Sequence, residues 1–319
     1  MQNNFAMAIS GFGGNEVFQE ISNFPLDWQL ADGEIIVENK FIGINPLDYK
    51  TRSGLGWAAK NIADKFPALL GFEFAGIVLQ SSAQNINIGT KVCGQKAGCF
   101  ASFIKTTAAN VAIVPDEVEL SSACVLPIAA LTASQIMQKI DFSPNQKIIV
   151  SAPFGGVGHF LLQMLNAKKS DIALEITAIS AEKNRPLALE RGVDKFIAYD
   201  GKITDTELTN IQADLFIDIY GSDDLHFYSA IKNNAEILTV PTIAVEKTKN
   251  TIEKLKCNIK VAGILVKENI ADLEHLLEMI KNRKLTAEIA KIYPLKNARE
   301  ALAELENGHC HGKIILSVE

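Results

Sequence analysis

One stretch decides how this chain of 319 residues folds: Ile148-Ile149-Val150-Ser151-Ala152-Pro153-Phe154-Gly155-Gly156-Val157-Gly158. Its first residues are uncharged and mostly β-branched, which indicates a buried strand, and the proline and glycines that follow indicate a sharp turn. Beyond the turn, Val157, Leu161, Met164 and Leu165 share one face of a predicted helix. The stretch therefore predicts a strand, a tight turn and a helix in immediate succession.

The same region carries no charged residue from Ile148 to Leu165, which raises the alternative of a membrane-spanning helix. Pro153 and three glycines interrupt its middle, and the composition changes there from β-type to helix-type residues. A spanning helix must satisfy its backbone hydrogen bonds internally, so these interruptions favour the strand, turn and helix. We expect no membrane contact.

Strand-like and helix-like segments alternate after Leu120. The predicted strands are Lys147–Ser151, Glu175–Ser180, Lys195–Tyr199, Asp214–Ile219, Glu236–Val240 and Lys260–Val266. The predicted helices are Val157–Lys168, Ala181–Arg191, Asp224–Asn233 and Lys247–Cys257, with a short one before Asp214. About six strands joined by crossovers of ~10–20 residues are typical of a doubly wound parallel sheet, the α/β arrangement of a Rossmann domain.

The two ends of the chain have a different pattern. Short strands and turns follow one another before residue 120, as in Gly33–Val37, Gly76–Leu79 and Val111–Val114. Two amphipathic helices, near residues 273–280 and 298–305, precede a final strand, Lys313–Val318. A sheet that is already complete has no place for this tail, so we expect it to fold back onto the N-terminal part. We predict a β-rich domain of residues 1–122 and 267–319 and a Rossmann domain of residues 123–266.

Composition narrows the class of protein. Hydrophobic residues make up 48% and charged residues 21%, which is typical of a folded globular chain, and the formal net charge of −6 argues against a nucleic-acid partner. The five cysteines form no Cys-x-x-Cys pair, so neither a disulfide framework nor a thiolate zinc site is indicated. The N-terminus shows no basic region before an apolar run, so we expect a cytoplasmic location.

The glycine turn has a chemical use. Glycines between a strand and a helix permit a tight turn, a close approach of backbone to a pyrophosphate, and close packing of helix on strand. The start of the helix offers free N–H groups and the positive end of the helix dipole to an anion. A purely structural turn is the alternative, but the alternation that follows favours a dinucleotide site with Gly155, Gly156 and Val157 at the pyrophosphate.

The end of the second predicted strand bears on the choice of cofactor. NAD-specific folds usually carry an acidic residue there for the ribose 2′-hydroxyl. Here Ser180 ends the strand, and Lys183 and Arg185 follow, which suits the 2′-phosphate of NADPH. The alternative is that Glu182 binds the ribose of NADH and that the two cations only decorate an exposed helix start. We favour NADPH.

Several motifs together resemble a known family over nearly the whole chain. They are Asn45-Pro46-Leu47-Asp48-Tyr49-Lys50-Thr51-Arg52-Ser53-Gly54, Phe66-Pro67-Ala68-Leu69-Leu70-Gly71-Phe72-Glu73-Phe74-Ala75-Gly76, Leu126-Pro127-Ile128-Ala129-Ala130-Leu131-Thr132-Ala133, the glycine turn, and Gly308-His309-Cys310-His311-Gly312-Lys313-Ile314. The chain resembles the medium-chain dehydrogenase/reductase superfamily, in its zinc-independent quinone oxidoreductase (zeta-crystallin-like) branch. The resemblance implies a GroES-like catalytic domain built from both termini, with a Rossmann domain inserted.

The chain departs from the zinc-dependent members of that superfamily. Those members carry a cysteine near the start of the first motif and Gly-His-Glu in the second, where this chain has Asn45 and Gly71-Phe72-Glu73. A catalytic zinc needs about three nitrogen, sulfur or oxygen ligands from the protein, and Phe72 cannot be one. We expect no zinc.

The resemblance also implies roles for single residues. It places Asn45 beside the nicotinamide, and Tyr49 and Arg52 near the substrate as the candidate catalytic residues. The alternatives are that Asn45 only caps a turn, that Tyr49 only packs, and that Arg52 only forms an ion pair with Glu73 or Asp48. The remaining residues implied along the cofactor cleft are Thr132, Val240, Pro241, Ile264 and Leu265.

These observations lead to an expected function. Without a metal to polarise oxygen, the natural substrates are electron-poor acceptors, so we expect an NADPH-dependent reductase of quinones or α,β-unsaturated carbonyls. The alternative is an NADPH-binding sensor or scaffold with little catalysis, because few polar candidates stand out near the substrate. We also expect a homodimer.

Overall fold

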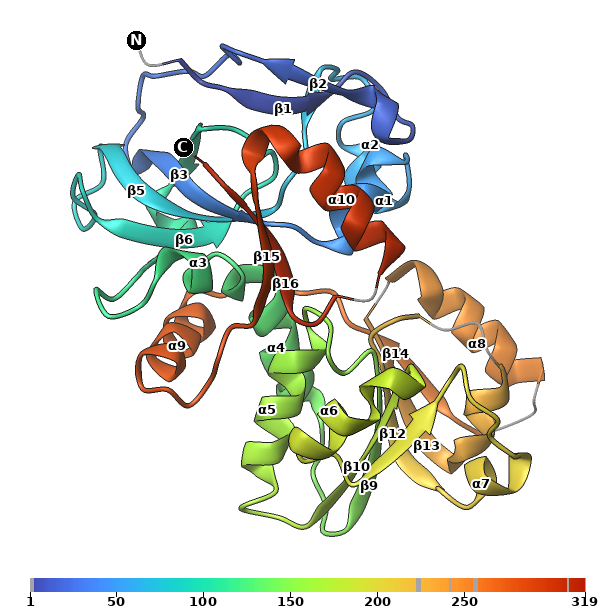
Figure 1. The fold of residues 1–319 in the computed structure, drawn as a ribbon. Helices are drawn as coiled ribbons and strands as arrows, with labels where there is room; N and C mark the ends of the chain where they lie inside the picture. Colours follow the sequence, from blue (N-terminus) through green and yellow to red (C-terminus); the bar gives the residue numbers. More distant parts are fainter. Residues whose placement is uncertain (1–2, 222–224, 241, 255–257, 309, 319) are drawn as a thin grey trace. The chain divides into compact units, whose positions relative to one another are not determined.

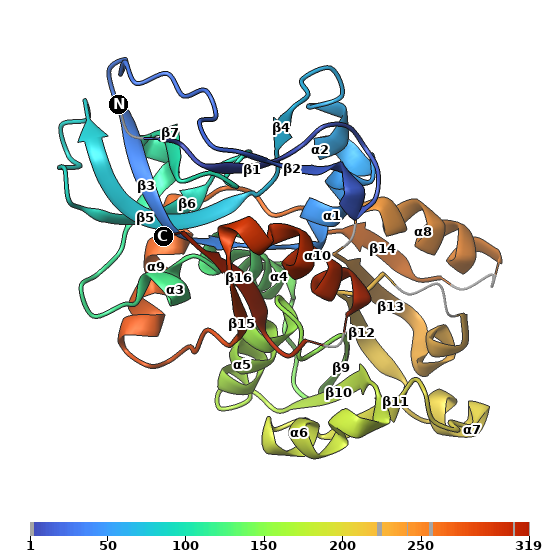
Figure 2. The ribbon, with the colours of Figure 1, turned by 45° about the horizontal axis from the view of Figure 1, so that its top comes forward.

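The computed structural model describes residues 3–221, 225–240, 242–254, 258–308 and 310–318 (Figures 1 and 2). The chain forms two compact units. The split unit comprises Met1–Leu131 and Glu268–Glu319, and the inserted unit comprises Thr132–Lys267. The first boundary lies later than the sequence suggests, because the π-helical segment η3 (Leu126–Ala130) contacts strands β5 and β6 of the split unit.

The inserted unit is built on a six-stranded parallel sheet of order β11-β10-β9-β12-β13-β14. The strands are β9 (Gln146–Ser151), β10 (Leu174–Ser180), β11 (Lys195–Ala198), β12 (Ala213–Asp218), β13 (Ile231–Thr239) and β14 (Lys260–Gly263). The predicted doubly wound Rossmann sheet is thus confirmed. Its central strands are buried on both faces, which explains why they are almost continuously apolar in the sequence.

Helices cover both faces of this sheet; α5 and α8 lie on opposite sides of it (Figure 1). The helical segments are α4 (Leu131–Lys139), α5 (Gly158–Lys168), η4 (Glu182–Asn184), α6 (Arg185–Glu190), α7 (Asp205–Thr209), η5 (Leu225–Ala230), η6 (Thr242–Ala244) and α8 (Val245–Lys254). One hydrophobic cluster joins Ile149, Phe216 and Ile237 of the sheet to Leu208 of α7 and Ile252 of α8. This burial of apolar side chains holds the helices on the sheet.

One predicted helix of this unit is wrong. The sequence suggests a helix over Asp224–Asn233, but the described part is the short 3-10 segment η5, and strand β13 already begins at Ile231. Ile231 pairs with Ala213 of β12, and the side chains of Ile231 and Ala235 are buried. Pairing with a strand distant in sequence therefore overrides the local preference.

The split unit contains two sheets. The three-stranded sheet has the order β2-β1-β4, and the larger one has the order β15-β16-β3-β5-β6-β8, with β7 also paired to β3. The strands are β1 (Ala6–Ile9), β2 (Phe18–Ile21), β3 (Glu34–Gly43), β4 (Ala68–Leu69), β5 (Glu73–Ser81), β6 (Lys91–Gln95), β7 (Phe103–Thr107), β8 (Val111–Ile113), β15 (Ile289–Pro294) and β16 (Lys313–Ser317). The chain's last strand, β16, runs antiparallel to β3, with Ile315 opposite Gly43. The sequence did not suggest β15, which pairs with β16 in parallel.

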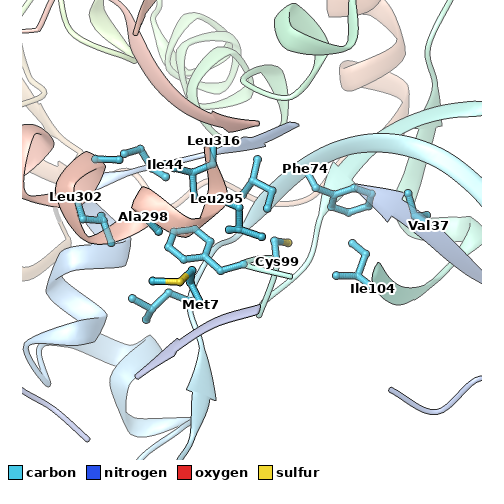
Figure 3. Close-up of a cluster of buried hydrophobic side chains, with 14 of the residues drawn as sticks. Met7, Val37, Ile44, Phe74, Cys99, Ile104, Leu295, Ala298, Leu302 and Leu316 are labelled. Carbon is cyan, nitrogen blue, oxygen red and sulfur yellow. The ribbon is translucent and has the colours of Figure 1, made fainter. Parts of the chain in front are cut away.

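The helices of the split unit pack around these sheets. They are η1 (Asn15–Val17), α1 (Pro46–Arg52), α2 (Gly56–Lys60), η2 (Ala108–Asn110), α3 (Leu120–Ala123), η3, α9 (Ile270–Lys281), η7 (Leu295–Asn297) and α10 (Ala298–Asn307). Helix α10 brings Ala298 and Leu302 against Met7, Ile44 and Leu316 in one core (Figure 3). The core therefore combines residues from both ends of the chain. It includes Ile44, the residue directly before Asn45.

One apolar stretch, Leu120–Lys139, is long and apolar enough to cross a membrane by length and composition alone. It comprises α3, η3 and α4, and most of it is buried inside the protein, as in a core helix. The uncharged segment from Ile148 to Leu165 is a strand, a turn and a helix, as the sequence predicts.

Candidate functional site

The glycine turn connects β9 to α5. Ala152 has a φ of 47°, in the left-handed region, and Gly155 N donates to its carbonyl oxygen at 3.2 Å. At Gly158 a side chain cannot be accommodated: a Cβ there would overlap the Ala152 oxygen and lie 2.6 Å from the carbonyl carbon of Pro153. The first residue of α5 is glycine because the helix packs directly on the backbone of the turn.

The position of this turn in the sheet suits a ligand. Strand β9 lies between β10 and β12, so the chain leaves β9 in one direction and later returns to its other side. In open parallel sheets such a reversal creates a crevice at the carboxyl ends of the strands. The N-terminus of α5, which has eleven residues, begins at this edge and presents backbone N–H groups to an anion. The turn can therefore hold a pyrophosphate.

A buried hydroxyl–carboxylate pair braces the same edge. Ser151 Oγ, at the end of β9, donates to Asp218 Oδ1 at the end of β12, over 2.8 Å. Ser151 Oγ also accepts from the N–H groups of Ile219 (2.9 Å) and Tyr220 (3.1 Å), and Asp218 Oδ1 accepts from Gly221 N (2.9 Å). This pair was not predicted from the sequence. Its signal was a polar residue directly after the apolar run of each strand, Ile148–Val150 in β9 and Leu215–Ile217 in β12.

The end of β10 holds the residues predicted to select the cofactor. Ser180 is buried, and its Oγ accepts from Asn184 Nδ2 at 2.8 Å. Arg185 forms two hydrogen bonds with the Glu182 carboxylate, at 2.6 and 2.8 Å. This pairing lowers the pKa of Glu182. Lys183 is exposed, and within the described part of the chain it has no ion-pair partner. Of the two cations, Lys183 is the one available to a ligand.

Two exposed tyrosines follow strands at the same edge. Tyr199 comes directly after β11 and is 52% exposed, and Tyr220 follows β12 and is 76% exposed. Loss of solvation, followed by the nearby Asp200 and Tyr220, raises the pKa of Tyr199, so the Tyr199 ring remains neutral near pH 7. Neither tyrosine was predicted from the sequence to belong to the site. Flat apolar rings at this edge can stack on a planar base.

The other predicted cleft residues follow β13 and β14. Val240 N donates to Asp218 O at 2.9 Å, and Ile264 N donates to Thr239 O at 2.8 Å. Ile264 is buried, whereas Leu265 is 55% exposed. The Thr239 hydroxyl is fully buried and has no hydrogen-bond partner among the residues described. Thr132 is buried in α4, and Pro241 lies outside the described residues.

In the split unit, Asn45 belongs to a buried ionic network. Lys313 Nζ donates to Ile44 O (2.8 Å), Asn45 Oδ1 (2.6 Å) and Glu73 Oε1 (2.8 Å). Asn45 Nδ2 donates to the same Glu73 oxygen at 2.8 Å, and the other Glu73 oxygen accepts from Ile128 N at 2.8 Å. Lys313, Asn45 and Glu73 are 3%, 5% and 0% exposed, so water does not screen their charges.

Two neighbours make room for this network and extend it. A Cβ on Gly43 would overlap the Glu73 carboxylate, so this glycine in β3 lets Glu73 approach the strand. Asp48 accepts from Asn45 N (2.7 Å) and Gly71 N (2.9 Å). Burial raises the pKa of Asp48 to about 7, although these two N–H groups and Lys313 oppose the shift. Asn45 is the N-cap residue of α1, and the Asp48 carboxylate accepts from its backbone N–H, while the Asn45 amide bonds to Lys313 and Glu73.

The two predicted catalytic residues lie on α1. Tyr49 is partly buried and packs against the core of the split unit. Arg52 is buried and donates to Gly13 O (3.2 Å), Asn15 Oδ1 (2.5 Å) and Glu306 Oε2 (2.8 Å). Its ion-pair partner is Glu306, and neither Glu73 nor Asp48. Arg52 therefore ties α1 to α10 and to the loop before β2.

Lys50, between Tyr49 and Thr51 on α1, was not predicted from the sequence as a site residue. Its side chain is partly buried, and burial lowers its pKa. In the part of the chain that the structure describes, Lys50 has no ion-pair partner. A lysine with a lowered pKa can release a proton closer to neutral pH than an exposed one.

The donor set for a metal is sparse. Among the described residues, no group of three or more His, Cys, Asp or Glu side chains is arranged to hold a metal ion. Phe72 is partly buried, with its ring edge-on to Trp57 and 6.1 Å between centroids. Cys93 and Cys124 are buried thiols whose pKa is raised by burial, which disfavours the thiolate that binds zinc.

Comparison with known proteins agrees with this geometry. Residues 31–118 match the alcohol dehydrogenase GroES-like domain, and residues 191–316 match a family described as zinc-binding dehydrogenase. A chloroplastic quinone-oxidoreductase homolog of Spinacia oleracea is 25% identical over 98% of this chain and 97% of its own length.

Solved structures show the same fold. The quinone oxidoreductase of Coxiella burnetii superposes with a TM-score of 0.89 at 25% identity, covering 100% of both chains. The Escherichia coli quinone oxidoreductase complexed with NADPH superposes with a TM-score of 0.82 at 23% identity, over 98% of this chain and 99% of that one. The matching domains, relatives and folds confirm the family resemblance read from the sequence: the chain is an oxidoreductase of the medium-chain dehydrogenase/reductase superfamily and belongs to its quinone oxidoreductase branch.

Proposed function

We propose that the protein is a zinc-free, NADPH-dependent reductase that transfers hydride to quinones or α,β-unsaturated carbonyls. The glycine turn at the reversal of the sheet carries this proposal, because Gly158 lets α5 pack on the turn and direct its N-terminus to the carboxyl edge. When bound, the nicotinamide supplies the hydride. The chain supplies binding, orientation and proton delivery.

The pyrophosphate would lie on Gly155, Gly156 and Val157, and the 2′-phosphate on Ser180 and Lys183. Arg185 is held by Glu182, so it contributes mainly by neutralising that carboxylate. With Glu182 engaged in this way, the NADH alternative loses its ribose acid. The NADPH complex of the Escherichia coli relative supports the same choice.

The chemistry of the donor set supports a reaction without zinc. The positions at which the zinc-dependent relatives carry ligands hold Asn45 and Phe72, and Asn45 is bound to a buried ammonium, Lys313. A cation beside this site would be repelled by Lys313 and would find Glu73 already paired. These residues do not fit a zinc ion.

Electron-poor acceptors suit a site without zinc, because they accept hydride without a strong Lewis acid. After hydride transfer, the acceptor oxygen or the adjacent carbon takes up a proton. Tyr49, which the family resemblance places near the substrate, is the first candidate for this proton, and Lys50 and solvent are further sources. Arg52 would act as a positioning residue, since its donors are engaged with Gly13, Asn15 and Glu306.

NADPH oxidation measured by absorbance with a panel of quinones and enones tests the proposal. Turnover with at least one acceptor, and a higher kcat/KM with NADPH than with NADH, is expected. No turnover despite cofactor binding would favour the second candidate, a cofactor-linked sensor or scaffold. The packing of Tyr49 and the engagement of Arg52 keep that candidate open. We also propose that the protein is a cytoplasmic homodimer. The molar mass of the purified protein, measured by light scattering, tests the dimer.

A further inference from the structure

We propose that Lys313 is a positioning residue, which fixes the Asn45 amide so that Asn45 offers an N–H donor to a carbonyl oxygen of a bound ligand. The inference rests on the proposed function, because such an oxygen occurs in the nicotinamide carboxamide and in a quinone or enone. Lys313 and Glu73 are 240 positions apart in the sequence, so only the folded chain forms this arrangement.

The charges on either side of Asn45 determine which way its amide points. An ammonium only donates hydrogen bonds, so the Asn45 atom at 2.6 Å from Lys313 Nζ is the oxygen. An ionised carboxylate only accepts, so the Asn45 atom at 2.8 Å from Glu73 Oε1 is the nitrogen. The opposite orientation would place oxygen against carboxylate and N–H against ammonium. The orientation therefore follows from chemistry.

The network leaves one hydrogen of Asn45 unused. The amide nitrogen carries two hydrogens, and Glu73 accepts one of them. Across residues 3–318, apart from the few that the structure leaves undescribed, nothing accepts the second, although Asn45 is only 5% exposed. Buried donors in folded proteins are almost always satisfied. A buried donor without a protein acceptor indicates a ligand acceptor, and an N–H group requires an oxygen there.

The free N–H group of Asn45 would assist hydride transfer whether it binds the nicotinamide carboxamide oxygen or the carbonyl oxygen of the acceptor. Bonded to the carboxamide, it would hold the nicotinamide ring in one orientation. Bonded to the acceptor carbonyl, it would stabilise the negative charge that develops on that oxygen as hydride arrives. Without Lys313 the amide could rotate and present its oxygen, which would repel a carbonyl.

A test must remove the orienting charges without leaving one of them buried alone. Lys313→Met by itself strands the Glu73 carboxylate, which can unfold the protein. We therefore combine Lys313→Met with Glu73→Gln, which removes both charges. This pair variant, Asn45→Ala and the triple variant complete a double-mutant cycle with the wild type. Lys195→Gln with Glu175→Gln is the matched control, because that exposed pair lies at the amino ends of β10 and β11.

Three quantities are measured for each protein: the NADPH Kd by fluorescence without acceptor, the kcat and KM for a quinone, and the melting temperature. The pair variant should bind NADPH more weakly, with a Kd raised about three- to tenfold, or it should raise the quinone KM and lower kcat by the same factor. In the Asn45→Ala background the same pair should change these constants less than twofold. A change in Kd identifies the carboxamide as the ligand oxygen, and a change confined to kcat and KM identifies the acceptor carbonyl. The control pair should alter none of them.

Two results overturn the inference. One is an equal loss from the pair variant in both backgrounds, since Lys313 would then act on structure and not through Asn45. The other is an Asn45→Ala variant with wild-type Kd, kcat and KM. If the wild type binds NADPH but does not oxidise it in the presence of any tested quinone or enone, the proposed function fails. The NADPH Kd values measured across the cycle then still decide the role of Lys313.

Discussion

Replacing Gly158 by alanine should destabilise the inserted unit, whereas the same change at Gly155 should not. At Gly158 the new Cβ would lie 2.6 Å from the carbonyl carbon of Pro153, where ordinary contacts begin at 3.4 Å. Helix α5 would have to move away from the turn by at least about 0.8 Å, the difference between these distances, and farther to clear the oxygen of Ala152. At Gly155 the nearest atom is Ala152 O at 3.6 Å, an ordinary contact, and the backbone has no positive φ.

Two effects of Gly158→Ala oppose each other. Alanine favours a helix over glycine by about 1 kcal/mol. Overpacking costs typically about 1–3 kcal/mol and more where backbone must move, and here the contacts are all with backbone atoms of Ala152 and Pro153. The clash should dominate, with a net loss of about 2 kcal/mol. At about 3 °C per kcal/mol for a unit of this size, the melting temperature should fall by about 6 °C.

The assay is thermal unfolding followed by circular dichroism, together with NADPH titration. Gly158→Ala should melt lower and bind more weakly, because the displaced helix carries its N–H groups away from the phosphates. Gly155→Ala should melt within about 1 °C of the wild type, yet weaken binding, because its methyl group stands where backbone would approach the pyrophosphate. A Gly158→Ala protein as stable as the wild type would refute the packing argument, and tight NADPH binding by both variants would refute the site.

Further outcomes follow from the same geometry. Lys183→Ala should raise the NADPH KM about tenfold and leave the NADH KM unchanged, since a charged hydrogen bond contributes roughly 1.5–3 kcal/mol; equal KM values for both cofactors in the wild type would contradict this. Gly156→Val should abolish NADPH binding while the circular dichroism spectrum is retained, and an undiminished titration would show the phosphate site to be misplaced. Activity should survive chelation, and elemental analysis should find no stoichiometric zinc; activity that chelator removes and zinc restores would overturn the mechanism. Tyr49→Phe should lower kcat no more than about tenfold, because Lys50 and solvent remain as proton sources, and complete loss of turnover would identify Tyr49 as the sole donor.

The sequence by itself determined the architecture of the inserted unit. The strand, turn and helix at residues 148–168 and the alternation after them are local patterns, and each predicted strand overlaps an observed one. Burial on both faces leaves a run of apolar residues in the central strands β9 and β12, so a single pass along the chain detects them. The prediction failed at η5, where pairing of Ile231 with β12 decided the backbone.

Tertiary structure alone decided which hydrogen-bond and ion-pair partners the residues of the candidate site have. The sequence offered Glu73 or Asp48 as the ion-pair partner of Arg52, whereas the partner in the structure is Glu306, 254 positions away. For Asn45 the sequence left open a place beside the nicotinamide or a turn cap; in the structure it is the N-cap of α1, and its amide also bonds to Lys313. The physical reason is that local periodicity reports which face of an element is buried, whereas the partner of a buried charge is chosen by folding. An unpaired charge is costly inside a protein, so the chain brings together groups whose separation in sequence carries no signal.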